Sequence, residues 1–131
     1  MSENTDTIRG AYEAFAQGNV PAVLETLAED VTWDVPKSLP NGGVHDGRDS
    51  VAEFFAGLAE AYAELRVEPD EYLDADGKVV ARGYHRGRGH NGVEFEARFV
   101  HTWTVEGGAV GEFVEVADTA EITPAMESAA A

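Results

Sequence analysis

The sequence predicts an α+β domain in which three helices pack on one face of a curved antiparallel sheet. Apolar residues recur at helical spacing in the first half of the chain. From Leu65 onward, short alternating runs are separated by Asp76-Gly77, Asn91-Gly92 and Gly107-Gly108, and each of these pairs is a hairpin-turn signal. A stretch of helices followed by a stretch of strands is typical of this fold class.

Each helix is predicted from its own apolar pattern. Residues 8–16, 20–28 and 51–62 carry apolar side chains at the spacing of a buried helix face. The first pattern stops at Gly18, which suits a helix end, and Asn19 is a suitable N-cap for the second helix. The aromatic residues within these patterns are expected mainly in the core.

The remaining segments are predicted as strands, with a tail at the end of the chain. One short strand precedes a loop that begins at Pro36, and four longer strands follow the third helix; the five ranges are 30–36, 66–75, 78–89, 93–105 and 109–117. Residues 119–131 end in Ser128-Ala-Ala-Ala, and we expect them to be frayed. The 131 residues have the usual size of one domain, so we expect a single domain over 1–131.

The charge and composition exclude several kinds of partner. Nine basic residues against 25 acidic ones give a net charge of −16, which repels both nucleic acid and anionic lipid surfaces. The chain has no cysteine, so disulfides and thiolate metal sites are excluded. Residues 1–9 are polar, unlike a signal peptide, and no apolar run is long enough to cross a membrane. We therefore expect a cytoplasmic protein that binds neither nucleic acid nor membrane.

The last predicted hairpin decides whether His101 and Glu115 meet. If residues 106–108 form a three-residue loop with Gly108 in the left-handed conformation, His101 lies opposite Phe113. Glu115 is then a diagonal neighbour of His101 on the same face. A strict two-residue turn would instead place Glu115 on the other face. We prefer the first register.

The Asn91-Gly92 turn predicts which residues of the preceding strand join this face. A two-residue loop here pairs His90 with Val93, which puts Arg82 opposite His101 and Tyr84 opposite Phe99. Arg82, His101 and Glu115 would then converge in an otherwise apolar pocket. The alternative is structural: Arg82 and Glu115 form an ordinary ion pair, and His101 is a hydrogen-bonded core histidine.

Motifs spread over residues 6–120 resemble the SnoaL-like branch of the nuclear transport factor 2-like (NTF2-like), or ketosteroid-isomerase-like, superfamily. They are Ala11-Tyr-Glu-Ala-Phe15-x-x-Gly18, Leu27-Ala-Glu-Asp30-Val-Thr-Trp33, His45-Asp-Gly47-Arg-Asp, Val79-Val-Ala-Arg82-Gly83, Phe99-Val-His101-Thr-Trp103 and Glu115-Val-Ala-Asp118. The resemblance implies a cone-shaped barrel of three helices and a strongly curved sheet, open at one end to a pocket. It also implies a homodimer formed through the sheet.

The resemblance favours one kind of reaction over another. The steroid isomerases' base falls at Val35, their oxyanion-hole tyrosine at Ala11 and their second oxyanion acid at His101. That reaction would therefore need Asp34, Tyr12 and His101 to substitute. The polyketide cyclases' catalytic acid/base falls at Glu115, fourteen residues after His101. The resemblance thus implies a cofactor-free acid/base enzyme acting on a small, apolar carbonyl compound.

We assign four catalytic residues on this basis. Glu115 is the base, made more basic by desolvation, and the donors are His101, Arg82 and Tyr84. The residues expected to line the ligand pocket are Tyr12, Trp33, Asp34, Phe55, Phe99, Trp103 and Phe113.

Two alternative functions stay open, and no metal is expected. One alternative is a non-catalytic ligand-binding or dimerisation domain. The other is an epoxide hydrolase in which Arg82 and Glu115 act with Tyr84 in place of an aspartate. We expect no metal, because His45, His85, His90 and His101 lack the spacing of a zinc site.

Overall fold

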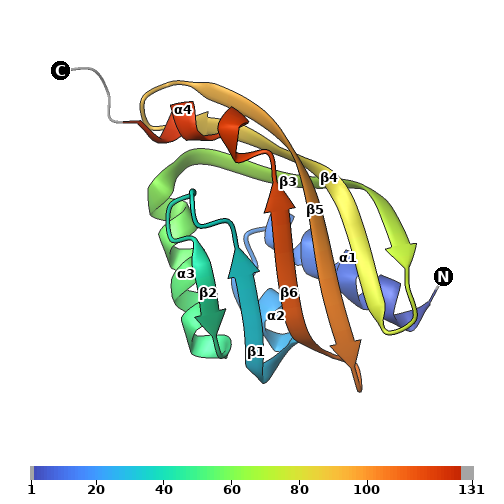
Figure 1. The fold of residues 1–131 in the computed structure, drawn as a ribbon. Helices are drawn as coiled ribbons and strands as arrows, with labels where there is room; N and C mark the ends of the chain where they lie inside the picture. The colour runs from blue at the N-terminus through green and yellow to red at the C-terminus, as the bar shows by residue number, and fades with distance from the viewer. Residues whose placement is uncertain (1, 128–131) are drawn as a thin grey trace.

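The computed structural model describes residues 2–127, and its first three helices lie on one side of a six-stranded sheet (Figure 1). Along the chain the elements are α1 (Glu3–Ala16), α2 (Val20–Glu25), β1 (Leu27–Val35), β2 (Gly43–Asp46), α3 (Arg48–Ala61), β3 (Tyr62–Asp74), β4 (Lys78–Gly89), β5 (Glu94–Glu106), β6 (Ala109–Ala117), η1 (Thr119–Glu121) and α4 (Thr123–Met126). The strand order in the sheet is β2-β1-β6-β5-β4-β3. The predicted α+β class is confirmed.

The sheet is curled but not closed, and it is mixed rather than purely antiparallel. Strands β3 to β6 form an antiparallel meander, as expected from their hairpin turns. Strand β1 pairs in parallel with β6, which comes last in the meander. The expectation of an antiparallel sheet is wrong at this one pairing, because β1 and β6 are far apart in sequence and no turn sets their relative direction.

The helix starts follow the local sequence, but one helix end does not. The Ser2 side chain caps α1 by accepting from the Thr5 N–H at 3.0 Å, and Asn19 caps α2. We predicted that the second helix would continue to Ala28, but it ends at Glu25. Leu27 already pairs with Val110 in the sheet and is fully buried there. Tertiary pairing therefore overrides the helical pattern at these residues.

The sequence pattern missed three short elements: β2 at one edge of the sheet, and η1 and α4 across one end of it. Strand β2 pairs with β1, and η1 and α4 lie across the end of the sheet beside the β4–β5 loop (Figure 1). Ile122 is fully buried, and the Asn91 side chain donates to the carbonyls of Pro124 and Glu127 at 2.9 and 3.0 Å. The prediction of a frayed tail is therefore wrong for 119–127, and residues 128–131 lie outside the described residues.

The last hairpin places Glu115 on the same face as His101, as expected, but with a different turn from the one we predicted. Gly107 and Gly108, with φ of 59° and 82°, form a two-residue turn that pairs Glu106 with Ala109, so the preferred three-residue loop is wrong. A bulge then shifts the register between Thr104 and Val105, where Gly111 is the extra residue on β6. The extra residue restores the inward face of β6, and His101 lies directly opposite Glu115.

The β4–β5 turn differs from our prediction by one residue, and this reverses the face of β4. The Gly89 N–H donates to the Val93 carbonyl at 2.9 Å, which makes a three-residue loop whose last residue, Gly92, has φ of 85°. Ala81 therefore lies opposite His101, in place of Arg82. Because side chains alternate along a strand, one residue of shift moves a whole strand's side chains to the other face.

The sharp curl of the sheet depends on glycines in β4. A Cβ added to Gly83 would lie 2.2 Å from the Glu68 carbonyl oxygen, and one added to Gly87 would lie 2.1 Å from that of Glu64. Strand β3 thus passes closer to β4 than any other residue type allows.

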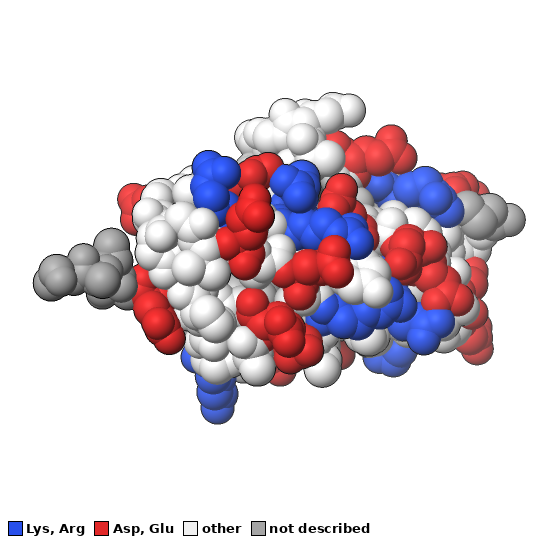
Figure 2. All heavy atoms as spheres, turned by 90° about the horizontal axis from the view of Figure 1, so that it is seen from above, with Lys and Arg blue, Asp and Glu red and all other residues white. Residues whose placement is uncertain are grey.

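The outer face of the sheet carries most of the arginines together with acidic partners. Figure 2 shows Lys and Arg side chains interleaved with Asp and Glu on the face seen from above. Arg86, for example, contacts Glu68 and Glu96 at 3.1 and 2.7 Å, and Arg98 contacts Asp70 at 3.3 Å. Exposed pairs of this kind contribute little to stability. No helix of the described residues is long and apolar enough to span a membrane.

Candidate functional site

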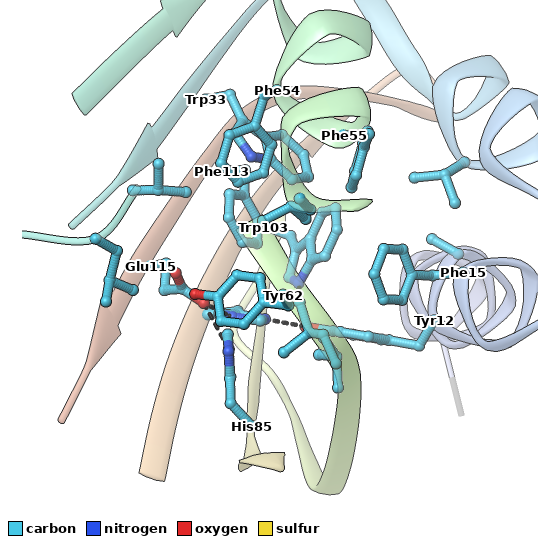
Figure 3. Close-up of a pocket in the computed structure, with 18 of the residues that line it drawn as sticks. Tyr12, Phe15, Trp33, Phe54, Phe55, Tyr62, His85, Trp103, Phe113 and Glu115 are labelled. Carbon is cyan, nitrogen blue, oxygen red and sulfur yellow. Dashed lines mark hydrogen bonds and ion pairs between the residues drawn. The ribbon is translucent and has the colours of Figure 1, made fainter. Parts of the chain in front are cut away.

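A cavity of about 80 Å³ lies between the helices and the concave face of the sheet (Figure 3). Eight aromatic side chains from helices and strands line it: Tyr12, Phe15, Trp33, Phe54, Phe55, Tyr62, Trp103 and Phe113. Polar groups gather at one end, where His85, His101 and Glu115 come from β4, β5 and β6. An apolar cavity with a few convergent polar groups is the usual form of a small-molecule site.

The three polar residues form one buried group, the Glu115 cluster, defined as His85, His101 and Glu115. Nε2 of His101 lies 2.6 Å from Oε2 of Glu115, and Nε2 of His85 lies 2.8 Å from the same oxygen. The His85 contact is not aligned as a hydrogen bond, and both of its ring nitrogens are buried without such a partner among the described residues. Both histidines therefore act on a single oxygen of the carboxylate.

A chain of hydrogen bonds fixes the tautomer of His101. Trp103 Nε1–H donates to the Tyr12 hydroxyl oxygen at 2.9 Å, and that hydroxyl lies 2.6 Å from Nδ1 of His101. The Glu115 carboxylate can only accept, so Nε2 of the neutral ring carries the proton, and Nδ1 is the acceptor of the Tyr12 O–H. The proton of neutral His101 then sits on Nε2 and is donated to Glu115.

The surroundings hold Glu115 ionised. Burial by itself would raise the pKa of Glu115, but the hydrogen bond from His101 and the electrostatic attraction of the His101 and His85 rings outweigh burial and hold that pKa below its ordinary value. Burial lowers the pKa of His101, so the ring is neutral at neutral pH. Our expectation that desolvation makes Glu115 more basic is wrong, because the histidines stabilise the carboxylate more than burial destabilises it.

Besides the buried nitrogens of His85, two polar groups at this end of the cavity have no hydrogen bond among the described residues. One is Oε1 of Glu115, since both histidines contact Oε2. The other is the Tyr62 hydroxyl, which points toward Glu115 in Figure 3. Burial and the Glu115 charge raise the pKa of Tyr62 to about 12, so the hydroxyl keeps its proton. An acceptor and a donor therefore remain available to a ligand.

Sequence reasoning missed His85 and Tyr62. The shifted β4–β5 register turns His85 inward, opposite Ala97, where it lies with an exposed fraction of 6%. A three-residue loop at Asn91-Gly92 would have predicted this from sequence. Tyr62 was assigned to the core because it continues the apolar pattern of the third helix. It is instead the first residue of β3, and no sequence signal marks its hydroxyl as facing a cavity.

Arg82 and Tyr84 do not lie at the site, so our prediction that they share the face of His101 is wrong. Arg82 is on the outer face and forms an ion pair with Glu71. The Tyr84 ring is also outside, with the guanidinium groups of Arg86 and Arg98 at 4.5 and 4.7 Å from its centroid. The one-residue register shift of β4 accounts for both displacements.

The other predicted pocket residues divide into three groups. Five of them line the cavity, namely Tyr12, Trp33, Phe55, Trp103 and Phe113. Phe99 lies beside His101, with its ring stacked on the imidazole at 3.9 Å, but does not line the cavity. Asp34 follows Trp33 on β1 and alternates to the other face, so it is not a lining residue.

The Glu115 cluster is also the one group within residues 2–127 whose ligand atoms could hold a metal ion, since they lie within 4.8 Å of one another. The spacing rule that excluded a metal from sequence did not anticipate ligands from three strands. Two donors on a tetrahedral zinc ion are about 3.3 Å apart, farther than the 2.6 and 2.8 Å found here. A metal would also need a lone pair on Nε2 of His101, and that nitrogen carries the proton that is donated to Glu115. The geometry fits a hydrogen-bonded carboxylate better than a metal site.

The fold and cavity define a class of protein: an α+β cone whose helices and curled sheet enclose an apolar pocket. The family model of the SnoaL-like domain matches residues 8–113. The chain belongs to this SnoaL-like family, within the NTF2-like superfamily. Among curated proteins, none matches the chain.

Solved structures of similar proteins cover nearly the whole chain. An NTF2-like protein of unknown function from Burkholderia pseudomallei K96243 is 35% identical, with a TM-score of 0.92 and coverage of 98% of this chain and 100% of that one. TerC, crystallised with polyporic acid, is 25% identical, with a TM-score of 0.89 and coverage of 97% and 100%. IdmH of Streptomyces antibioticus, for which a polyketide cyclase activity has been suggested, is 20% identical, with a TM-score of 0.79 and coverage of 94% and 97%. At that identity IdmH shows the fold alone.

Proposed function

We propose that this protein binds a small, largely apolar carbonyl compound in the aromatic cavity and catalyses proton transfer on it without a cofactor, with Glu115 as the proton acceptor. One observation carries the proposal: an ionised carboxylate with an unengaged oxygen lies at the end of an otherwise apolar cavity. The membership in the SnoaL-like family and the crystallisation of TerC with polyporic acid support a ligand-binding role.

The chemistry is a single proton transfer. Oε1 of Glu115 removes a proton from the carbon next to the carbonyl, and the electron pair of that C–H bond moves into the carbon framework to form an enolate. The enolate can then be reprotonated or can attack a second carbonyl of the same molecule. His101 and His85 hold Oε2 and so orient the carboxylate. The lowered pKa of Glu115 restricts the reaction to acidic C–H groups.

That lowered pKa also favours the second candidate, a domain that binds such a compound without changing it. A carboxylate stabilised by two histidines is a weak base and still a good hydrogen-bond acceptor. The epoxide hydrolase alternative has no support, since Arg82 and Tyr84 lie on the outer face of the sheet.

The proposal also includes two expectations from the sequence: that the protein is a homodimer and that it is cytoplasmic. A homodimer formed through the sheet is supported by Val116 of β6, an apolar side chain with an exposed fraction of 66%. Light scattering of the purified chain tests it, and a monomer at micromolar concentration would contradict it. A cytoplasmic location is tested by fractionation of the producing cells.

The decisive assay is hydrogen–deuterium exchange. The ketone 2-indanone, whose methylene protons are benzylic, is incubated with the protein in D₂O, and deuterium incorporation is followed by NMR. We expect the wild-type protein to accelerate exchange, and Glu115→Gln to reduce the protein-dependent rate by about 100-fold or more. Arg82→Ala is the matched control, because its side chain faces away from the cavity, and should exchange at the wild-type rate. Binding of 2-indanone without acceleration would favour the non-catalytic candidate, and no binding would contradict both.

A further inference from the structure

We propose that Tyr62 is the residue that selects the ligand, by donating a hydrogen bond from its hydroxyl group to the carbonyl oxygen of a neutral ketone. This inference rests on the proposed function, because it assumes that the cavity takes a small molecule. It adds a second contact beside Glu115, and it assigns the carbonyl and the acidic C–H of the ligand to two different side chains.

The polar groups at the Glu115 end of the cavity leave one accessible donor free. Both ring nitrogens of His101 are engaged, one by Tyr12 and the other by Glu115. The Tyr12 hydroxyl accepts from Trp103 and is directed at His101. The nitrogens of His85 are buried against the protein. The Tyr62 hydroxyl likewise has no hydrogen bond within residues 2–127, but its oxygen is not among the fully covered atoms, so it is the unused donor at this end that a ligand can reach.

The position of Tyr62 is fixed by the fold. It follows the last residue of α3 and begins β3, with extended φ and ψ of −116° and 140°, and its N–H donates to the Leu58 carbonyl. Its ring lies 5.7 Å from that of Phe95, and it belongs to a small apolar cluster with Ile122 and Ala125, both fully or almost fully buried. The C-terminal segment therefore holds the ring in place, and the hydroxyl is presented toward Glu115 (Figure 3).

The charges at this end decide which ligands Tyr62 accepts. Glu115 is ionised, so a ligand carboxylate would place two like charges in an apolar cavity, where repulsion is strong. Tyr62 stays protonated, because burial and the same carboxylate oppose its ionisation. A neutral donor beside a fixed anion suits a neutral acceptor such as a ketone oxygen, and disfavours an anion of the same shape.

A donor and an acceptor side by side also match the two reacting parts of one ketone. If Oε1 of Glu115 takes the proton from the carbon, the negative charge moves from Glu115 to the carbonyl oxygen. The proton is transferred to Glu115, which becomes a neutral carboxylic acid. The electron pair of the C–H bond forms the C=C bond of the enolate, so atoms and charge balance. The Tyr62 hydroxyl then donates to the oxygen on which the charge develops, which is where a donor assists most.

The cavity limits the size of the ligand. Its volume of about 80 Å³ is smaller than the cavity of about 150 Å³ that binds benzene in an engineered protein. Several apolar lining residues are only half-buried, namely Phe15, Leu39, Pro40, Leu58, Leu65 and Val67, so the cavity meets solvent between them. A compound of one or two rings must therefore displace some of these side chains or protrude between them, while its carbonyl reaches Tyr62.

The test compares three probes of similar shape: 2-indanone, indane and indane-2-carboxylate. Both tryptophans of the chain line the cavity, so their fluorescence reports binding. For the wild-type protein we expect measurable binding of 2-indanone and indane, and at least 10-fold weaker binding of the carboxylate. Tyr62→Phe should weaken 2-indanone binding by about 5- to 20-fold and change indane binding by less than 2-fold.

Two controls separate a hydrogen bond from a packing effect. Tyr84→Phe removes a hydroxyl on the outer face and should change neither affinity. The carbonyl stretching frequency of bound 2-indanone should be lower in the wild-type protein than in Tyr62→Phe, which a purely structural role would not produce. Equal weakening of both neutral probes, or no weakening of either, would overturn the role of Tyr62 alone. Failure of every probe to bind the wild-type protein would overturn the proposed function as well.

Discussion

The alkaline stability of Tyr62→Phe tests the electrostatics of the cavity most directly. Burial, and then the charge of Glu115, raise the pKa of Tyr62 from 10.0 to about 12. The folded protein therefore holds the Tyr62 proton more strongly than the unfolded chain. This contribution to stability is fully present below pH 10, the unfolded pKa, and is lost as the pH rises toward 12.

The magnitude follows from the size of the shift. Two pKa units correspond to about 2.7 kcal/mol of the free energy of unfolding. Relative to Tyr62→Phe, which has no proton to lose, the wild-type protein should lose about 2 kcal/mol of this between pH 10 and pH 12. At pH 7 the two proteins should differ by less than about 1 kcal/mol, since the hydroxyl has no hydrogen bond among the described residues to lose.

Urea unfolding followed by tryptophan fluorescence, at several pH values from 7 to 12, measures this difference. Other tyrosines titrate in both proteins and cancel in the comparison. Absorbance at 295 nm gives the ionisation midpoint of Tyr62 independently, as the difference between wild type and variant. Glu115→Gln should lower that midpoint and still leave it above 10, because burial is the larger cause. A stability difference that stays constant from pH 9 to pH 12 would refute the reasoning.

Two further predictions concern the curled sheet and the Glu115 cluster. Gly83→Ala should destabilise the protein by about 2 kcal/mol or more, because its Cβ would meet the backbone of Glu68. The control Gly10→Ala, at an open position in α1, should instead stabilise it by about 0.5 to 1 kcal/mol, and equal melting temperatures for the two variants would contradict the close β3–β4 contact. Stoichiometric Zn²⁺ should leave the melting temperature unchanged, since the cluster has hydrogen-bond spacing; a rise that His85→Ala removes would show a metal site instead.

Most of the fold could be predicted from the sequence, because its signals are local. The helix caps Ser2 and Asn19 and the hairpin turns act within a few residues, and they place the elements in the order found. The failures lie where distant residues decide. Leu27 was predicted to be helical but pairs with β6 in the sheet. Ile122 was predicted to lie in a frayed tail but is fully buried at the end of the sheet.

The candidate site was predicted in part, and its errors have a single physical source. His101 and Glu115 were placed together, and the structure brings them to 2.6 Å. Arg82 and Tyr84 were placed with them and are not, because a glycine turn can hold two or three residues in its loop and the sequence does not distinguish these cases. One residue of difference reverses every side chain of the strand.

The sequence by itself determined the class of fold, the aromatic content of the cavity and the pair of His101 with Glu115. Tertiary structure alone decided which groups join that pair. Two turns and one bulge set the register, which brought His85 to Glu115 and sent Arg82 outside. The packing of the C-terminal segment then held Tyr62 over the cavity. The physical reason is that a turn signal fixes where a strand begins, while the face it presents depends on pairing and burial across the whole sheet.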